Sequence, residues 1–181
     1  KSVDIHSGLD STLLILQNKL KGKPGAVEIE VIKDYGNLPL VECYAGQLNQ
    51  VFMNILSNAI DALDDQRSPA AKMAEPPRIH IRTARQSRDR IQITIQDNGA
   101  GMPEPVQKQL FNPFFTTKPV GKGTGMGLSI SYQIVTERHH GQIRCQSAIG
   151  QGTTFIIEIP LLQSARGDSQ GLSAQPQEQV S

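Results

Sequence analysis

A polar stripe follows one face of residues 47–63, a segment that otherwise has the apolar spacing of an amphipathic helix. Asn54, Asn58 and Asp61 are spaced by four and three residues, so a helix places their side chains on one face. Asparagine competes for backbone hydrogen bonds, and glutamate or lysine would suit a merely solvated face better. Carboxamide oxygens can hold a hard cation without adding charge, so the stripe is either a solvated face or a ligand site. The whole stripe comprises Gln47, Gln50, Asn54, Asn58, Asp61 and Asp65.

A second candidate site lies where the alternating segment 90–96 ends, in the sequence from Gln96 to Met102. Asp97 comes directly after the strand, where a carboxylate can accept a hydrogen bond from an exocyclic amine. Gly99 and Gly101 allow the backbone to approach a ligand closely. An Asp-Asn-Gly sequence is also common in ordinary turns, so either interpretation is open at this point.

The third candidate is a glycine-rich segment in which every second residue from Gly121 to Gly127 is glycine. It precedes a predicted helix, and free backbone N–H groups with the positive end of a helix dipole favour phosphate. The segment is not a Walker loop, because no Gly-Lys-Ser/Thr ends it. It does not follow a strand, as the dinucleotide fingerprint requires. The alternative is a flexible linker.

The elements that must position these residues follow from hydrophobic periodicity. Their order predicts an α+β domain with one mostly antiparallel sheet and helices stacked on one face. We expect the Asn112 to Thr124 segment to be a mobile loop and the chain from Ser164 onward to be disordered. The predicted helices are 7–21, 47–63, 103–110 and 126–139, and the predicted strands are 27–31, 40–44, 78–84, 90–96, 141–147 and 153–159.

Composition excludes several classes of protein. Lys+Arg 18 and Asp+Glu 17 leave a net charge of +1, which argues against binding nucleic acid or acidic membranes through bulk charge. The 4% of aromatic residues predicts an aliphatic core. Cys43 and Cys145 are too few for a disulfide scaffold and are expected to be buried free thiols. We expect a soluble, intracellular chain, since it has no membrane-length apolar run and no signal peptide. Because the sequence opens without Met, we expect it to be a fragment of something larger.

The motifs together resemble the ATP-binding catalytic domain of two-component sensor histidine kinases. This superfamily also includes gyrase-type topoisomerases, chaperones and mismatch-repair ATPases. The resemblance covers about residues 26–160, and the run from Phe114 to Lys118 resembles sensor kinases in particular. It rests on Asn54-x-x-x-Asn58-Ala59, Asp97-x-Gly99-x-Gly101, Phe111-x-x-Phe114, Gly123-x-Gly125-x-Gly127 and Gly150-x-Gly152-Thr153.

The resemblance implies a Bergerat-type fold, a two-layer sandwich of a mixed sheet and helices with a lid over ATP. It implies that Asp97 accepts a hydrogen bond from the adenine amino group and that Thr153 assists Asp97 through a water. Gly99 and Gly101 are implied to let the backbone pass close to the base. The resemblance assigns Asn58 as the ligand of Mg²⁺. Asn54 is implied as a catalytic residue that contacts metal or phosphate.

The phosphates are assigned to the predicted loop 112–124, which forms the lid, and to the start of the helix that follows it. Lys118 is the favoured phosphate-contacting cation and a catalytic residue, and Lys122 is the second cation. Many relatives carry a lysine where this chain has Asp61, so the phosphate-contacting cations are the lid lysines or arginine residues that the sequence does not place. The cradle that contacts the phosphates comprises Gly123, Thr124, Gly125, Met126, Gly127 and Leu128.

No histidine of this chain fits the phospho-acceptor pattern, in which an acidic residue follows the histidine; the four are His6, His80, His139 and His140. The implied partners are therefore the protein's own dimerisation hairpin and a response regulator, in the cytoplasm, without nucleic acid or direct membrane contact. The implied division is a linker and first helix at 1–25, the catalytic domain at 26–162 and a tail at 163–181. The alternatives are a gyrase- or chaperone-type ATPase, an anti-sigma-type serine kinase or a nucleotide sensor.

Overall fold

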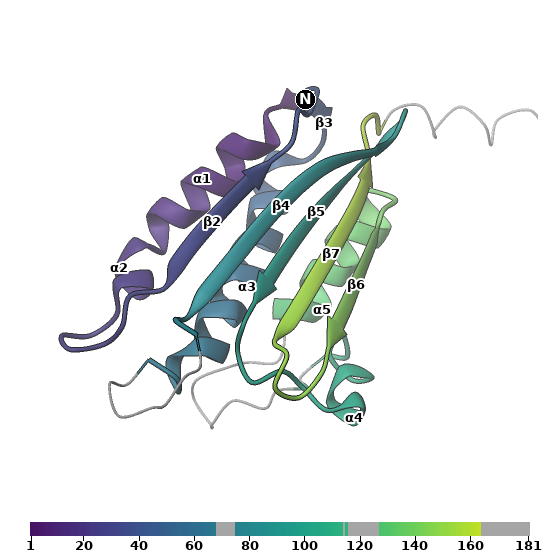
Figure 1. The fold of residues 1–181 in the computed structure, drawn as a ribbon. Coiled ribbons are helices and arrows are strands. Elements are labelled where there is room, and N and C mark those ends of the chain that lie inside the picture. Colours follow the sequence, from purple (N-terminus) through teal and green to yellow (C-terminus); the bar gives the residue numbers. More distant parts are fainter. Residues whose placement is uncertain (68–74, 114, 116–126, 164–181) are drawn as a thin grey trace, which may run out of the picture.

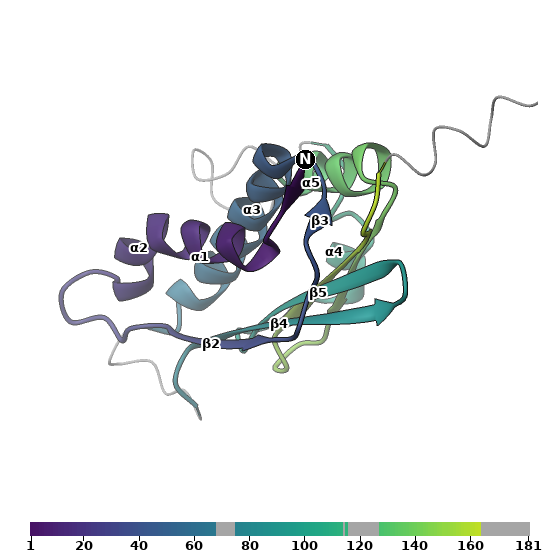
Figure 2. The same ribbon diagram turned by 90° about the horizontal axis from the view of Figure 1, so that it is seen from above.

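The computed structural model describes residues 1–67, 75–113, 115 and 127–163. A five-stranded sheet carries all its helices on one face (Figures 1 and 2), which confirms the predicted α+β class. In chain order the elements are β1 (Ser2–Val3), α1 (Ile5–Ile15), α2 (Gln17–Lys21), β2 (Glu30–Tyr35), β3 (Val41–Glu42), α3 (Ala45–Asp64), β4 (Arg78–Ser87), β5 (Arg90–Asp97), α4 (Glu104–Gln107), α5 (Gly127–Gln133), the π-helical η1 (Ile134–Arg138), β6 (Gln142–Ser147) and β7 (Thr153–Pro160).

The sheet has the strand order β2-β4-β5-β7-β6. β2 pairs with β4 in parallel, and the other three pairings are antiparallel. Because successive side chains of a strand point to opposite faces, every second residue meets the helices. The core is aliphatic, as composition predicts, and its inward isoleucines are Ile79, Ile81, Ile91, Ile93, Ile95, Ile157 and Ile159. No helix in the described part of the chain is long and apolar enough to span a membrane.

The longest helix, α3, agrees with the predicted segment 47–63 to within two residues at each end. Its apolar stripe is buried against the sheet and α1 because residues three and four apart share a helix face. The buried set is Leu48, Val51, Phe52, Ile55, Leu56, Ala59, Ile60 and Leu63.

The single helix predicted for residues 7–21 is wrong, because the structure breaks it into α1 and α2 at Leu16. Leu16 has φ −86° and ψ 4°, and this turn keeps both Leu16 and Leu20 in the core. The buried guanidinium of Arg67 explains where α2 ends: it donates to the carbonyl oxygens of Lys19 at 2.8 Å and Leu20 at 2.6 Å. These are carbonyl groups that a helix end leaves without an intrahelical partner.

The strand predicted at 27–31 is also wrong, since β2 begins only at Glu30. The N–H of Val27 donates to the carbonyl of Arg67, and that of Ile29 donates to Leu20. The first half of this alternating run is thus hydrogen-bonded to the ends of α3 and α2 rather than to the sheet. β3 lies within the predicted strand 40–44 but pairs with β1 in a separate two-stranded sheet.

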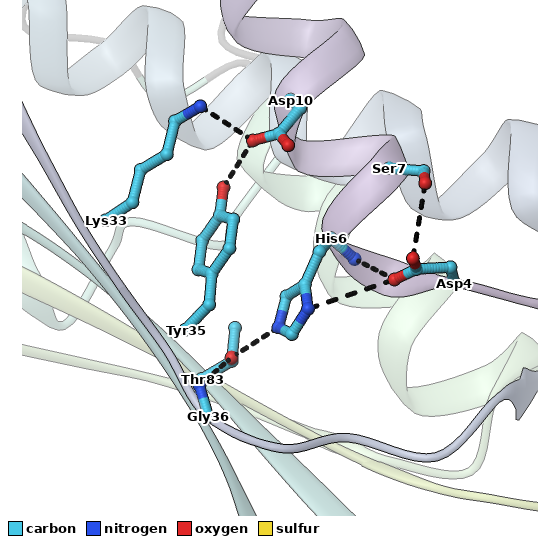
Figure 3. A network of polar contacts seen from close by, with 8 residues as sticks. All are labelled: Asp4, His6, Ser7, Asp10, Lys33, Tyr35, Gly36 and Thr83. Carbon is cyan, nitrogen blue, oxygen red and sulfur yellow. Dashed lines mark hydrogen bonds and ion pairs between the residues drawn. The ribbon is translucent and has the colours of Figure 1, made fainter.

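A polar network joins α1 to the edge of the sheet (Figure 3). The ring of His6 stacks on Tyr35 with centroids 4.3 Å apart, and its Nε2 lies 2.7 Å from Thr83 Oγ1. Tyr35 donates to Asp10, which also pairs with Lys33. Burial and the Asp10 carboxylate both raise the pKa of Tyr35, so its hydroxyl remains a donor. These contacts fix α1 over β2.

Segment 1–25, predicted as a linker and first helix, shares one apolar core with the rest of the described chain. Ile5, Leu9 and Leu13 of α1 are buried in the same cluster as α3 and the sheet. The division of the chain at residue 25 stays a prediction, and 164–181 lies outside the described residues.

The helix predicted at 126–139 begins at Gly127 as α5 and continues as η1. His139 follows η1 and is fully buried. Its Nε2 accepts from the N–H of Tyr44 and its Nδ1 contacts the carbonyl of Ile134, an arrangement of neutral imidazole. Burial lowers the pKa of His139, so its role is in packing.

Two further predictions concern short elements and thiols. The helix predicted at 103–110 is shorter, because α4 covers only Glu104–Gln107. Cys43 and Cys145 are both free thiols, as predicted, and Cys43 is buried. The predicted burial of Cys145 is wrong: its side chain is half-buried, because β6 is an edge strand of the sheet. Burial raises the pKa of Cys145 to about 12, helped by the negative charge of Asp97.

Candidate functional site

Asp97, the last residue of β5, is placed on the helix-covered face by the alternation of the strand. Its cross-strand neighbours are Ile79 on β4 and Thr153 on β7. The side chain is 4% exposed, and its Oδ1 accepts from the N–H of Gly99 at 2.9 Å. Burial raises the pKa of Asp97 to about 6, against the backbone hydrogen bonds from Gly99 and Thr153 that lower it. A nearly buried carboxylate with few protein donors is suited to accept from a ligand.

The glycines beside Asp97 are required by close backbone contacts. A Cβ at Gly101 would overlap the carbonyl of Ala148, and its φ is +75°. A Cβ at Gly152 would overlap the main-chain oxygen of Asp97, with φ at +78°. A Cβ at Gly99 would lie 3.1 Å from the carbonyl of Ala62 on α3. Glycine is needed where backbones approach this closely, and L side chains rarely adopt such φ angles.

The loop after β5 and the turn between β6 and β7 are joined through the side chain of Ser147. Its Oγ accepts from the N–H of Met102 at 2.8 Å and donates to the carbonyl of Gly152 at 3.0 Å. The same Oγ lies 2.9 Å from Oγ1 of Thr153. Gln107 of α4 adds two bonds of 2.8 Å, to the carbonyls of Met102 and Ser147. The sequence patterns did not single out Ser147, because its role depends on cross-strand register.

Asn54 and Asn58 lie one turn apart on α3, and both are half-buried. The side-chain nitrogen of Asn54 donates to the carbonyl of Gly127 at 3.0 Å and to the hydroxyl of Ser131 at 3.1 Å. At Asn54 the stripe therefore faces α5, which rules out a uniformly solvated face. Asn58 and Asp61 follow toward the end of α3 that adjoins Gly99. Ser131, which is fully buried, was not among the residues predicted for the site.

Several predicted site residues lie outside the described residues. Of the cradle, Gly127 and Leu128 are described and begin α5. Phe111 is described too, and its ring packs against Tyr132 with centroids 5.3 Å apart. The residues outside are Phe114, Lys118, Lys122, Gly123, Thr124, Gly125 and Met126, together with most of the predicted loop 112–124.

Asn98 is a third residue to which the sequence patterns assign no role, although it lies next to Asp97. Its Oδ1 accepts from the N–H of Arg78 at 2.7 Å, and its Nδ2 donates to the carbonyl of Pro76 at 2.8 Å. Asn98 thus holds the start of β4 against the Asp97 loop. The Asp-Asn-Gly sequence indicates a turn, and asparagine side chains in turns commonly hydrogen-bond to the backbone.

Two open cavities in the described chain lie away from the candidate site. One of about 260 Å³ lies between α1 and the start of α3, and one of about 340 Å³ lies between α1, α2 and β2. Neither is bordered by Asp97, Asn54 or Asn58. The described residues also contain no group of three or more His, Cys, Asp or Glu side chains that could hold a metal.

The fold is an α+β domain whose mixed sheet carries helices on one face and a nearly buried carboxylate at the end of β5. Residues 44–163 match the family described as histidine kinase-, DNA gyrase B- and HSP90-like ATPase. The match covers more than half of the chain, so the chain belongs to this family of ATP-binding domains.

The similar proteins are kinases. The sensor kinase CckA of Brucella abortus is 37% identical over 169 residues, which are 90% of this chain and 17% of that protein. Sporulation kinase E of Bacillus subtilis is 37% identical over 139 residues, 77% of this chain and 17% of the kinase. The chain therefore spans about a sixth of these relatives.

A solved structure matches nearly end to end. The nucleotide-free catalytic domain of the histidine kinase ThkA superposes with a TM-score of 0.71 at 26% identity, over 89% of this chain and 97% of that one. ThkA in complex with the response regulator TrrA has a TM-score of 0.70 at 23% identity, over 92% of this chain and 43% of that one, and shows the shared fold.

Proposed function

We propose that this chain is the ATP-binding catalytic domain of a sensor histidine kinase, which transfers the γ-phosphoryl group of ATP to a histidine on a separate dimerisation hairpin. The observation that carries the proposal is Asn54. A water-directed ATPase of the gyrase or chaperone type has a glutamate there as general base. Here a carboxamide takes that place, and its nitrogen is hydrogen-bonded to Gly127 and Ser131. It cannot take a proton from water, which favours transfer to another acceptor over hydrolysis.

The adenine would be recognised by Asp97. Above a pH of about 6 its carboxylate is ionised and can accept from the 6-amino group. Thr153, its cross-strand neighbour, would assist through a water. The overlap that a Cβ at Gly101 would cause shows why the loop beside this carboxylate has no side chain there.

The residues of α3 fit a magnesium ion. Mg²⁺ takes few protein ligands, keeps several waters and prefers oxygen, and Asn58 offers a carboxamide oxygen. When bound, Mg²⁺ neutralises charge on the phosphates. Asn58 would hold the ion, with Asn54 positioned one turn earlier by its bonds to α5. Asn58→Ala should weaken magnesium-dependent binding of ATP more than metal-free binding of ADP, and equal losses would place Asn58 in the scaffold.

The phosphates would be bound by the segment that leads into α5. Lys118, and then Lys122, are the proposed cations, and the last two residues of the cradle, Gly127 and Leu128, belong to α5. The support for the lysines is the sequence resemblance. The proposed partners are the acceptor hairpin and a response regulator, and the ThkA–TrrA complex is a structural relative that contains such a regulator.

The test is transfer between separate fragments. The chain is mixed with the acceptor hairpin of its own full-length protein and γ-labelled ATP, and the two are then separated. We expect acid-labile, base-stable label on the hairpin, no label on this chain and little phosphate release. Asn58→Ala or Gly125→Ala should remove the label. Rapid phosphate release by the chain alone would favour a water-directed ATPase, and acid-stable label on a serine of an added partner would favour a switch kinase.

A further inference from the structure

The hydroxyl of Ser147 is fully used by its neighbours. A serine hydroxyl has one proton to donate and two lone pairs to accept with. The carbonyl of Gly152 can only accept, so the Ser147 proton goes to it, over 3.0 Å. The N–H of Met102 can only donate, so it occupies one lone pair, over 2.8 Å. The remaining lone pair faces the Thr153 hydroxyl at 2.9 Å. Thr153 must therefore donate its proton to Ser147.

This direction determines what Thr153 can offer to a ligand. Once its proton is directed to Ser147, the Thr153 oxygen has only lone pairs left. Thr153 is the cross-strand partner of both Asp97 and Ser147, and its side chain lies on the same sheet face as theirs. Thr153 and Asp97 are 5% and 4% exposed. This end of the sheet thus presents two acceptors side by side, a carboxylate and a hydroxyl oxygen.

The surrounding loops hold this arrangement in place. The N–H of Gly150 donates to the carbonyl of Ala100 at 2.7 Å, which joins the turn before β7 to the loop after β5. Gln107 holds the carbonyl of Met102 and that of Ser147 from the α4 side. Because both loops are anchored, the Ser147 hydroxyl cannot easily turn away from Thr153 without breaking its bonds to Met102 and Gly152.

We propose that Ser147 is a specificity-determining positioning residue that makes Thr153 an acceptor and thereby favours a 6-amino purine over a 6-oxo purine. The inference rests on the proposed function, in which Asp97 and Thr153 face position 6 of the base. An amino group, or a water that it orients, donates to both acceptors. A 6-oxo group would instead bring a third acceptor against them, and buried acceptors without a donor are costly.

The test compares the affinities of ADP and inosine diphosphate, which differ at position 6, by calorimetry on the whole chain. The titrations are run at about pH 8, well above the pKa of about 6 that burial gives Asp97. In Ser147→Ala the Thr153 hydroxyl is free to turn and donate. We expect the ratio of ADP to inosine diphosphate affinity to fall roughly fivefold, the size of one neutral hydrogen bond. The control is Ser87→Ala, which removes an exposed hydroxyl bonded to Asp89 and should leave the ratio unchanged.

A double-mutant cycle then tests the route of the effect. In a Thr153→Val background, Ser147→Ala should no longer change the ratio, because the hydroxyl through which it acts is gone. If Ser147→Ala does not fold, Ser147→Cys replaces the hydroxyl by a weakly hydrogen-bonding thiol and should lower the ratio in the same direction.

The contradicting results are distinct. Equal losses for both nucleotides would make Ser147 a merely structural residue, and an effect that persists in Thr153→Val would overturn the proposed route; either result leaves the kinase proposal intact. A wild-type chain that binds no ADP would overturn the proposed function and this inference with it.

Discussion

The side-chain nitrogen of Asn54 lies 3.0 Å from the carbonyl oxygen of Gly127 and joins the middle of α3 to the first residue of α5. The same nitrogen reaches the hydroxyl of Ser131 one turn further on. A residue that sequence reasoning places at the metal or phosphates is thus also the contact between the two helices. The position of α5 therefore depends in part on this amide.

Asn54→Ala should therefore lower the free energy of unfolding as well as the rate of phosphoryl transfer to the hairpin. Two neutral hydrogen bonds are lost, at about 1 kcal/mol each. The matched control is Gln50→Ala, one turn earlier on the same stripe and exposed, which should change the free energy of unfolding by much less. Urea unfolding measures both variants. Equal losses would show that the contact to α5 contributes nothing.

Arg67→Ala should be among the most destabilising changes outside the apolar core. Its side chain is 5% exposed and forms an ion pair with Asp64. It also donates hydrogen bonds to the carbonyls of Lys19, Leu20 and Val27. Removing it breaks four hydrogen bonds of the guanidinium, and we expect a loss of about 3 kcal/mol in the free energy of unfolding. The control is Arg82→Ala, whose guanidinium is 60% exposed and pairs with Asp34, with an expected loss below about 1 kcal/mol. Similar losses in both would contradict the role of Arg67.

The raised pKa of Asp97 fixes the direction in which this residue makes stability depend on pH. Burial raises its pKa from 3.8 to about 6, so between these values the folded chain keeps a proton that the unfolded chain has lost. The contribution of Asp97 to the free energy of unfolding therefore falls as pH rises through this window. Carboxyl-carbon NMR should show a midpoint near 6, and Asp97→Asn should lack this falling contribution in urea unfolding. A midpoint near 4 would mean that the carboxyl is well solvated.

Two glycines two residues apart should respond differently to alanine. At Gly152 the added Cβ would overlap the backbone of Asp97, whereas at Gly150 nothing lies within 4 Å. Both have positive φ, so Gly150→Ala carries only the backbone strain, about 1 kcal/mol. Gly152→Ala should also displace Asp97 and abolish ADP binding by calorimetry. Retained ADP affinity in Gly152→Ala would show that the Asp97 loop has room to adjust.

Helical and strand periodicity locate Asn54, Asn58 and Asp97 from sequence, because each position is determined by a local repeat. Ser147 is different. Its task depends on the register that sets it opposite Thr153, and alternation gives the face of a strand but not its partner.

The misplaced strand at 27–31 has a similar cause. Its N–H groups are hydrogen-bonded to Leu20 and to Arg67, which lies 40 residues beyond Val27, and no periodicity within the segment reports on this. The π-helical η1 also follows from tertiary contact: the imidazole of His139 bonds to Ile134 and to the distant Tyr44. Local patterns therefore predict which residues face the site, and long-range partners decide where the elements end.

The proposed function depends above all on Asp97 as the group that binds adenine, and calorimetric titration of Asp97→Asn with ADP tests this most directly. The amide presents a donor where an acceptor is needed, so we predict that binding becomes too weak to measure while circular dichroism and the unfolding transition show an intact fold. Wild-type chain titrated in parallel should bind ADP. Unchanged affinity in a folded Asp97→Asn variant would contradict the account.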